Sequence, residues 1–145
     1  MKKMILSLAI AFTTLSAFAG ADNVSQKVLN AFNNDFIAAK QVTWTVASDY
    51  YKAEFMYNDN YVFAYYSLDG ELLGMTRYIT TLDLPIHLQM NLKKKYGNYW
   101  VSDLFEVAKN DATSYYVTIE NADTQIVLKS TGGSDWSVFK TVKKA

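Results

Sequence analysis

Residues 60–79 read NYVFAYYSLDGELLGMTRYI, and this stretch decides how the rest of the chain is understood. Two apolar, aromatic segments flank the dipeptide Asp69-Gly70. A dipeptide of this kind between alternating segments is the strongest short-range signal for a β-hairpin, because glycine adopts positive φ without steric cost. The stretch therefore predicts two antiparallel strands joined by a tight turn.

The segments before the hairpin predict one helix and two more strands. Residues 41–46 alternate between apolar and polar side chains, which is typical of a half-buried strand, and we expect Trp44 in the core. Residues 50–57 form a second strand after a short turn. Upstream, over residues 24–36, an apolar side chain recurs at every fourth position, as in an amphipathic helix. The recurring residues are Val24, Val28, Phe32 and Phe36.

The second half of the sequence follows the same order. Pro85 suits the first turn of a helix over residues 85–96, because its missing N–H would have no helical partner there. Four strands are then predicted, at residues 100–107, 114–121, 124–130 and 135–142. The pattern predicts an α+β fold of two tandem α-β4 repeats, about 22–80 and 81–145. Together they form one antiparallel sheet of about eight strands with two helices on one face.

The N-terminal residues predict export. A basic start, an apolar segment over residues 5–12 and the sequence Ala17-Phe18-Ala19 have the order of a secretory signal peptide. Cleavage after Ala19 would make 1–19 the signal peptide and leave 20–145 as one periplasmic or secreted domain. The chain has no cysteine that could carry a lipid, so we expect no stable membrane anchor.

This succession resembles the PepSY-like family of exported bacterial proteins, which is related in fold to the beta-lactamase inhibitory protein. The motifs that carry the resemblance are Ala31-Phe32, Val42-x-Trp44, Tyr51-x-Ala53-x-Phe55, Ala64-Tyr65-Tyr66-x-x-Asp69-Gly70-x-Leu72-x-Gly74, Leu84-Pro85 and Tyr96-x-x-Tyr99. The family usually has Phe-Pro after the first helix, where this chain has Phe36-Ile37. The resemblance implies an exported domain whose relatives bind proteins on the sheet face, without enzymatic activity.

Few residues in the chain are suited to catalysis or to metal binding. There is one histidine, His87, and no cysteine, which excludes thiol catalysis and argues against a zinc site. Asp111, Asp123 and Asp135 recur at 12-residue spacing, but each falls where a turn is expected. We therefore expect no cofactor, no metal and no enzyme; a hydrolase with dispersed carboxylates stays open as a weaker alternative. Without the signal peptide the chain has 12 basic and 14 acidic residues, which gives no footprint for nucleic acid.

The distinctive signal is an excess of aromatic residues on strands. Alternation places many of them on the side that should face away from the helices, and such a patch is typical of a binding site. The simpler explanation is that tyrosines cover an open sheet through cross-strand pairs. The predicted binding residues are Tyr50, Lys52, Met56, Tyr61, Phe63, Tyr65, Tyr78 and Trp136. The sequence predicts an exported protein partner, with inhibition or modulation of a hydrolase as one possibility. The alternative is a small ligand such as a peptide, a glycan or a hydrophobic molecule. We expect a monomer or a weak dimer.

Overall fold

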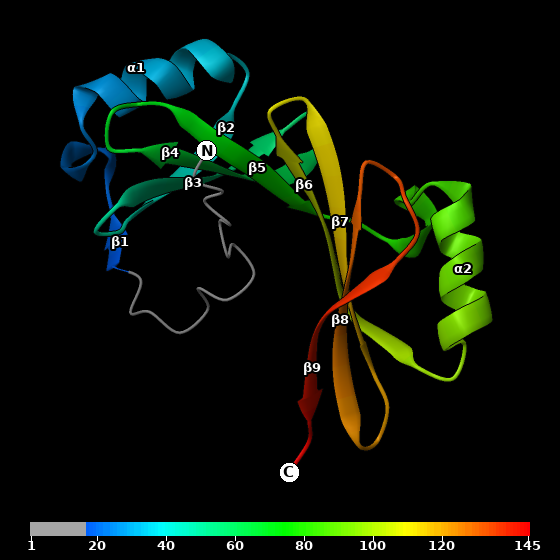
Figure 1. The fold of residues 1–145 in the computed structure, drawn as a ribbon. Helices are drawn as coiled ribbons and strands as arrows, with labels where there is room; N and C mark the ends of the chain where they lie inside the picture. The colour runs from blue at the N-terminus through cyan, green and yellow to red at the C-terminus, as the bar shows by residue number, and fades with distance from the viewer. Residues whose placement is uncertain (1–16) are drawn as a thin grey trace, which may run out of the picture.

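The computed structural model describes residues 17–145 as one antiparallel sheet of nine strands in sequence order, with two α-helices. The strands are β1 (Ala17–Ala19), β2 (Lys40–Val46), β3 (Tyr50–Tyr57), β4 (Asn60–Ser67), β5 (Leu72–Tyr78), β6 (Trp100–Lys109), β7 (Ala112–Glu120), β8 (Thr124–Thr131) and β9 (Ser137–Lys143). The helices are η2 (Ala21–Asn23), α1 (Gln26–Asp35), η3 (Thr81–Asp83) and α2 (Ile86–Tyr96). Figure 1 shows α1 beside the first strands of a strongly twisted sheet and α2 beside the later ones. The predicted fold class is confirmed. No helix of residues 17–145 has the length and apolar character needed to cross a membrane.

The short strand β1 is absent from the sequence-based prediction. The sequence places its residues at the end of the signal peptide, but Ala17 to Ala19 pair with Val46 to Trp44 of β2. Cleavage after Ala19 would remove this strand and leave the eight that the sequence predicts. The rest of the predicted signal peptide, residues 1–16, lies outside the described residues, so the cleavage site and the domain boundaries stay predictions.

The first core lies between α1 and strands β2 to β4. The helix begins after Ser25, whose side chain accepts a hydrogen bond from the N–H of Val28 at 3.4 Å. Val28 and Phe32 then point toward the sheet and are buried. Trp44 is also buried, as the sequence predicted. The buried Tyr66 hydroxyl donates a hydrogen bond to Asp35 at 2.8 Å, which ties β4 to the last turn of α1.

The second core lies between α2 and strands β6 to β8. Leu88 and Leu92 of the helix are buried in it together with Leu104, Val117, Ile119 and Leu128 of the sheet. Ile86 and Met90, on the opposite side of the same helix, are exposed at 73% and 65%. The two α-helices begin 60 residues apart, at Gln26 and Ile86. Each α-helix covers a core of its own.

The hairpin between β4 and β5 closes through a slightly longer loop than the sequence suggested. The N–H of Gly70 donates to the carbonyl of Ser67 at 3.0 Å, and the N–H of Ser67 donates to the carbonyl of Glu71 at 2.9 Å. Gly70 has φ +86°, so the loop is a turn followed by a left-handed glycine, a common three-residue hairpin connection. A Cβ at Gly70 would lie 3.1 Å from the carbonyl oxygen of Lys27, so the loop also packs closely against α1.

Replacing Gly70 by alanine is expected to lower the free energy of unfolding by about 1–2 kcal/mol, because alanine must adopt a left-handed conformation. Gly132→Ala is the matched control, since Gly132 has φ +63° but nothing within 4 Å of an added Cβ. Urea unfolding of both variants separates the backbone cost from the contact with α1. Equal losses would show that the close approach to Lys27 does not contribute.

Candidate functional site

The strand register divides the sheet into two faces. Ala53 pairs with Ala64 and Phe55 with Val62, and all four lie in the core beneath α1. Alternate residues point the other way. The pairs on that other side are Lys52 with Tyr65, Glu54 with Phe63, Met56 with Tyr61 and Tyr50 with Ser67. This side, opposite the helices, is called the open face below.

Seven of the eight predicted binding residues lie together on the open face. Tyr78 lies on the same face as the six residues of β3 and β4. Thr76, two residues before it on β5, pairs with Phe63, and residues two apart on a strand share a face. Ring centroids are 5.7 Å apart for Tyr61 and Phe63, and also 5.7 Å apart for Phe63 and Tyr78. Tyr61 and Tyr78 are 49% and 53% exposed. The rings thus form a connected, half-exposed row rather than isolated side chains.

The row continues into the second half of the chain through residues that the sequence analysis missed. Tyr78 pairs with Phe105 across β5 and β6. Phe105 stacks on Tyr116, with centroids 5.2 Å apart and planes at 9°. Tyr116 in turn meets Phe139 of β9 at 5.5 Å. We call the connected set Tyr61, Phe63, Tyr78, Phe105, Tyr116 and Phe139 the aromatic track.

A usable signal for the missed residues existed in β6. Phe105 and Val107 alternate with Leu104 and Glu106, as the earlier strands do, but Glu106 on the helix side obscures which face is apolar. On the helix side, Arg77 and Glu106 form a two-pronged ion pair with nitrogen–oxygen distances of 3.1 and 3.2 Å. This ion pair explains why two charged residues lie on the helix side of the sheet, and it aligns β5 with β6. Phe139 had no such signal, because it sits at an irregularity in the β8–β9 pairing.

Three lysines lie over rings of the open face. The Nζ of Lys52 lies 5.3 Å from the centroid of Phe63, and Lys129 lies at the same distance from Tyr116. Lys144 lies 4.7 Å from Trp100. Each contact is worth roughly 0.5–2 kcal/mol, depending on how far the cation is desolvated. The open face therefore combines apolar rings with positive charge.

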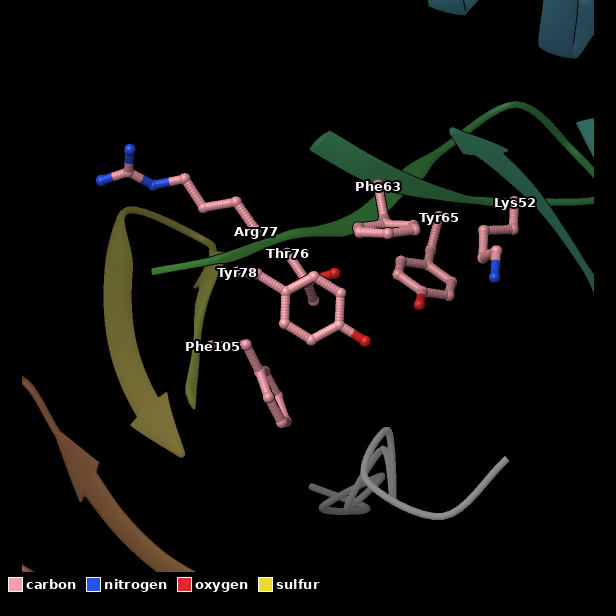
Figure 2. Close-up of a pocket in the computed structure, with 7 residues that line it drawn as sticks. All are labelled: Lys52, Phe63, Tyr65, Thr76, Arg77, Tyr78 and Phe105. Atoms are coloured by element: carbon pink, nitrogen blue, oxygen red, sulfur yellow. The ribbon is translucent and has the colours of Figure 1, made fainter. Parts of the chain in front are cut away.

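A small hollow opens in the middle of the aromatic track. It encloses about 60 Å³, and Figure 2 shows the side chains around it. They are Lys52, Phe63, Tyr65, Thr76, Tyr78 and Phe105, while the Arg77 side chain extends away from the others. Pockets that enclose small-molecule ligands have volumes of about 300–1,000 Å³. The hollow can hold a side-chain head group but cannot enclose a drug-sized molecule.

Burial alters two ionisable groups near this hollow. It raises the pKa of Tyr65 to about 12, so the phenol stays protonated and remains a hydrogen-bond donor at physiological pH. Burial also raises the pKa of Asp103, which lies on the open face two residues before Phe105.

A larger hollow, of about 300 Å³, lies elsewhere, between α2 and the start of β6. It is lined by Thr81, Gln89, Leu92, Lys93, Tyr96, Gly97, Tyr99, Val101 and Ile119. None of the predicted binding residues contributes to it. A small ligand on the open face and one in this hollow would thus use different parts of the chain.

The eighth predicted binding residue, Trp136, is not on the open face, and this prediction is wrong. Its side chain is 8% exposed within the second core, and its indole N–H donates to the carbonyl of Leu88 at 3.0 Å. Asp135 fixes this position by accepting hydrogen bonds from Asn91 at 2.9 Å and from Lys95 at 2.6 Å. Trp136 therefore joins the β8–β9 loop to α2 and leaves no surface for a partner.

The other residues weighed for chemistry have structural surroundings. His87 contacts the backbone carbonyl of Gly133 and so joins α2 to the same loop. Asp111 lies in the β6–β7 turn with φ 61°. Within residues 17–145 there is no group of three or more His, Cys, Asp or Glu side chains arranged to hold a metal ion.

The fold and the open face together define a class of protein: the chain is an α+β protein with the BLIP-like fold. A BLIP-like protein from Bacteroides fragilis NCTC 9343 matches with TM-score 0.71 and 17% identity, over 82% of this chain and 85% of that chain. A candidate periplasmic protein from Bacteroides eggerthii DSM 20697 matches with TM-score 0.72 and 14% identity, over 83% and 88%. A DUF2874 family protein from Bacteroides ovatus ATCC 8483 matches with TM-score 0.71 and 18% identity, over 81% and 86%.

Comparison by sequence adds no further relative. The chain matches no protein-family model, and no curated protein matches it. The BLIP-like resemblance inferred from the motifs is confirmed at the level of the fold.

Proposed function

We propose that this chain is an exported, non-catalytic domain that binds another exported protein through the aromatic track. The observation that carries the proposal is the continuity of the track. Its rings pass from β4 through β5, β6 and β7 to β9 with consecutive contacts of 5.2–5.7 Å, apart from the cross-strand pair Tyr78–Phe105. The track therefore joins the two halves of the chain into one surface on the open face.

The chemistry of the track favours a protein as the partner. Aromatic residues provide large contact area at low entropic cost and are enriched at the centres of protein interfaces. Lysine side chains at the ring faces supply charge for orientation and specificity. The hollow of about 60 Å³ accepts one side chain but does not enclose a ligand.

The class of partner is proposed from the fold and the N-terminal sequence. A signal peptide over residues 1–19 would deliver the chain to the periplasm or the medium, and one of the solved structures with this fold is named as a candidate periplasmic protein. A second is named BLIP-like, which supports inhibition or modulation of an exported hydrolase as the form that binding takes.

Replacing Tyr78 and Phe105 together by alanine is expected to reduce capture of the partner from a periplasmic extract by about 30-fold or more. Removal of central aromatic anchors typically costs at least ~2 kcal/mol of binding energy. The wild-type chain and the variant are immobilised in equal amounts, and the captured proteins are identified and quantified by mass spectrometry.

The matched control replaces Ile86 and Met90 by alanine, because both are exposed on α2, away from the open face. Its captured proteins should match those of the wild type. Identical sets for the wild type and the Tyr78/Phe105 variant would contradict the proposal. If no protein is captured while a peptide or glycan raises the melting temperature, the small-ligand alternative is favoured.

A further inference from the structure

We propose that the hollow between Tyr78 and Phe105 receives the cationic head group of a lysine or arginine side chain of the partner protein. This inference rests on the proposed function and specifies the chemistry of its central contact. Three observations carry it: the carboxylates around the hollow, its size, and a cation that the chain already holds at one end.

Two carboxylates lie beside the hollow, although its described lining contains Lys52 and Arg77 and no carboxylate. Asp103 lies on the same face of β6 as Phe105, diagonally across from Tyr78. Glu54 lies opposite Phe63 on the neighbouring strand. Among the described residues neither carboxylate forms an ion pair. Of the two basic residues in the described lining, Arg77 is paired with Glu106 and its side chain extends away from the others, so Lys52 is the one whose charge is not paired within residues 17–145.

Both carboxylates act on the hollow itself. Burial raises the pKa of Tyr78, and the negative charges of Asp103 and Glu54 raise it further. Burial likewise raises the pKa of Asp103, although a backbone hydrogen bond at Leu104 opposes the effect, and no ion pair within residues 17–145 offsets the lost hydration. A bound ammonium or guanidinium group would remove that penalty and would lie against the faces of aromatic rings.

The size of the hollow and the position of Lys52 point to the same guest. The enclosed volume of about 60 Å³ equals that of roughly two water molecules, so the guest is a head group rather than a whole molecule. Lys52 places its Nζ 5.3 Å from the centroid of Phe63 at one end of the hollow. The chain thus already holds an ammonium group over one of these rings, while no lysine or arginine of residues 17–145 forms an ion pair with Asp103 or lies over the ring of Tyr78.

The test uses N-acetyl-arginine amide as the probe and N-acetyl-leucine amide as its uncharged comparison. Each is titrated into the isotope-labelled full-length chain, and backbone amide shifts are followed by nuclear magnetic resonance. The arginine probe is expected to shift the amides of Tyr78, Asp103 and Phe105 at millimolar concentration. Salt at about 0.5 M should weaken this binding, because the Debye length falls below about 5 Å. The leucine probe should produce neither effect.

Asp103→Asn is expected to weaken binding of the arginine probe about fivefold to tenfold, because it removes the charge and keeps the shape. Asp123→Asn, in the exposed β7–β8 turn, is the matched control and should leave binding unchanged. In the unaltered chain, affinity should fall as the pH drops through the pKa of Asp103, above the ordinary value of 3.8 for aspartate. The Asp103→Asn variant should show a smaller pH dependence than the unaltered chain.

The inference is overturned if the arginine probe shifts none of these amides, if the leucine probe binds equally well, or if Asp103→Asn binds the arginine probe as the wild type does. These outcomes are separate from the capture experiment. A Tyr78/Phe105 variant that loses its partner while the arginine probe fails to bind would retain the protein-binding proposal and reject only the cationic guest.

Discussion

Replacing Phe32 by alanine is expected to lower the free energy of unfolding by about 3–5 kcal/mol, as for other large buried aromatic residues. Phe32 is 4% exposed and lies at the centre of the first core. Its ring centroid lies 5.1 Å from that of Trp44, 5.0 Å from Phe55 and 5.5 Å from Phe36. No other side chain of α1 contacts the sheet through so many rings, so truncation leaves a cavity that its neighbours cannot fill without moving α1.

Urea unfolding followed by circular dichroism measures this loss, and an unchanged slope against urea would show that only stability has changed. Phe139→Ala is the matched control, because Phe139 is 37% exposed at the end of the aromatic track. It should lose less than Phe32→Ala, about 1–2 kcal/mol, since 37% of Phe139 is in contact with water and its truncation leaves no cavity beneath a helix. A Phe32→Ala variant no less stable than Phe139→Ala would show that α1 does not hold the first core together.

The same experiment reports on the connection between the halves of the chain. Each half has its own buried core, one under α1 and one under α2. Between them run the β5–β6 pairing and the ion pair of Arg77 with Glu106. If these contacts couple the two cores, the Phe32→Ala variant should unfold in a single transition. If they do not, a second transition should occur at the urea concentration where the wild type unfolds, because the α2 half is still intact.

The strands and faces of the first half were predictable because they depend on local signals. Alternation within residues 50–57 and 60–67 assigns each side chain to one of two faces, and the turn at Asn58 and Asp59 sets their register. For this reason the sequence alone could assign Tyr61, Phe63 and Tyr65 to the face of the sheet that Ala53 and Phe55 do not share. Because side chains alternate between the two faces of a strand, identifying the buried residues also assigns every other residue of that strand to a face.

The continuation of the aromatic track could not be predicted in this way. The pairing of Tyr78 with Phe105 joins strands separated by η3 and α2, so no hairpin turn sets its register. Phe139 reaches Tyr116 through an irregularity in the β8–β9 pairing, and alternation does not apply there. Binding surfaces assembled across such junctions depend on tertiary contacts rather than on any one segment.

Trp136 was misplaced for a related reason. The sequence predicted a strand from residue 135, which would give Trp136 a strand face, but β9 begins at Ser137. The loop before it is bent by Asp135, whose carboxylate accepts a hydrogen bond from the N–H of Trp136 at 2.7 Å and is held by Lys95. The indole therefore turns toward α2 rather than toward the open face.

The consequence is a prediction that separates the structural role of Trp136 from a binding role. Trp136→Ala is expected to lower the free energy of unfolding by about 3–5 kcal/mol through the cavity it leaves. Trp136→Phe should lose only about 1–2 kcal/mol, because a ring still fills part of the site and mainly the hydrogen bond to Leu88 is lost. Urea unfolding gives both values.

At temperatures where each variant stays folded, partner capture should equal that of the wild type. A folded Trp136→Phe variant that loses its partner would return this residue to the binding surface and contradict its place beneath α2.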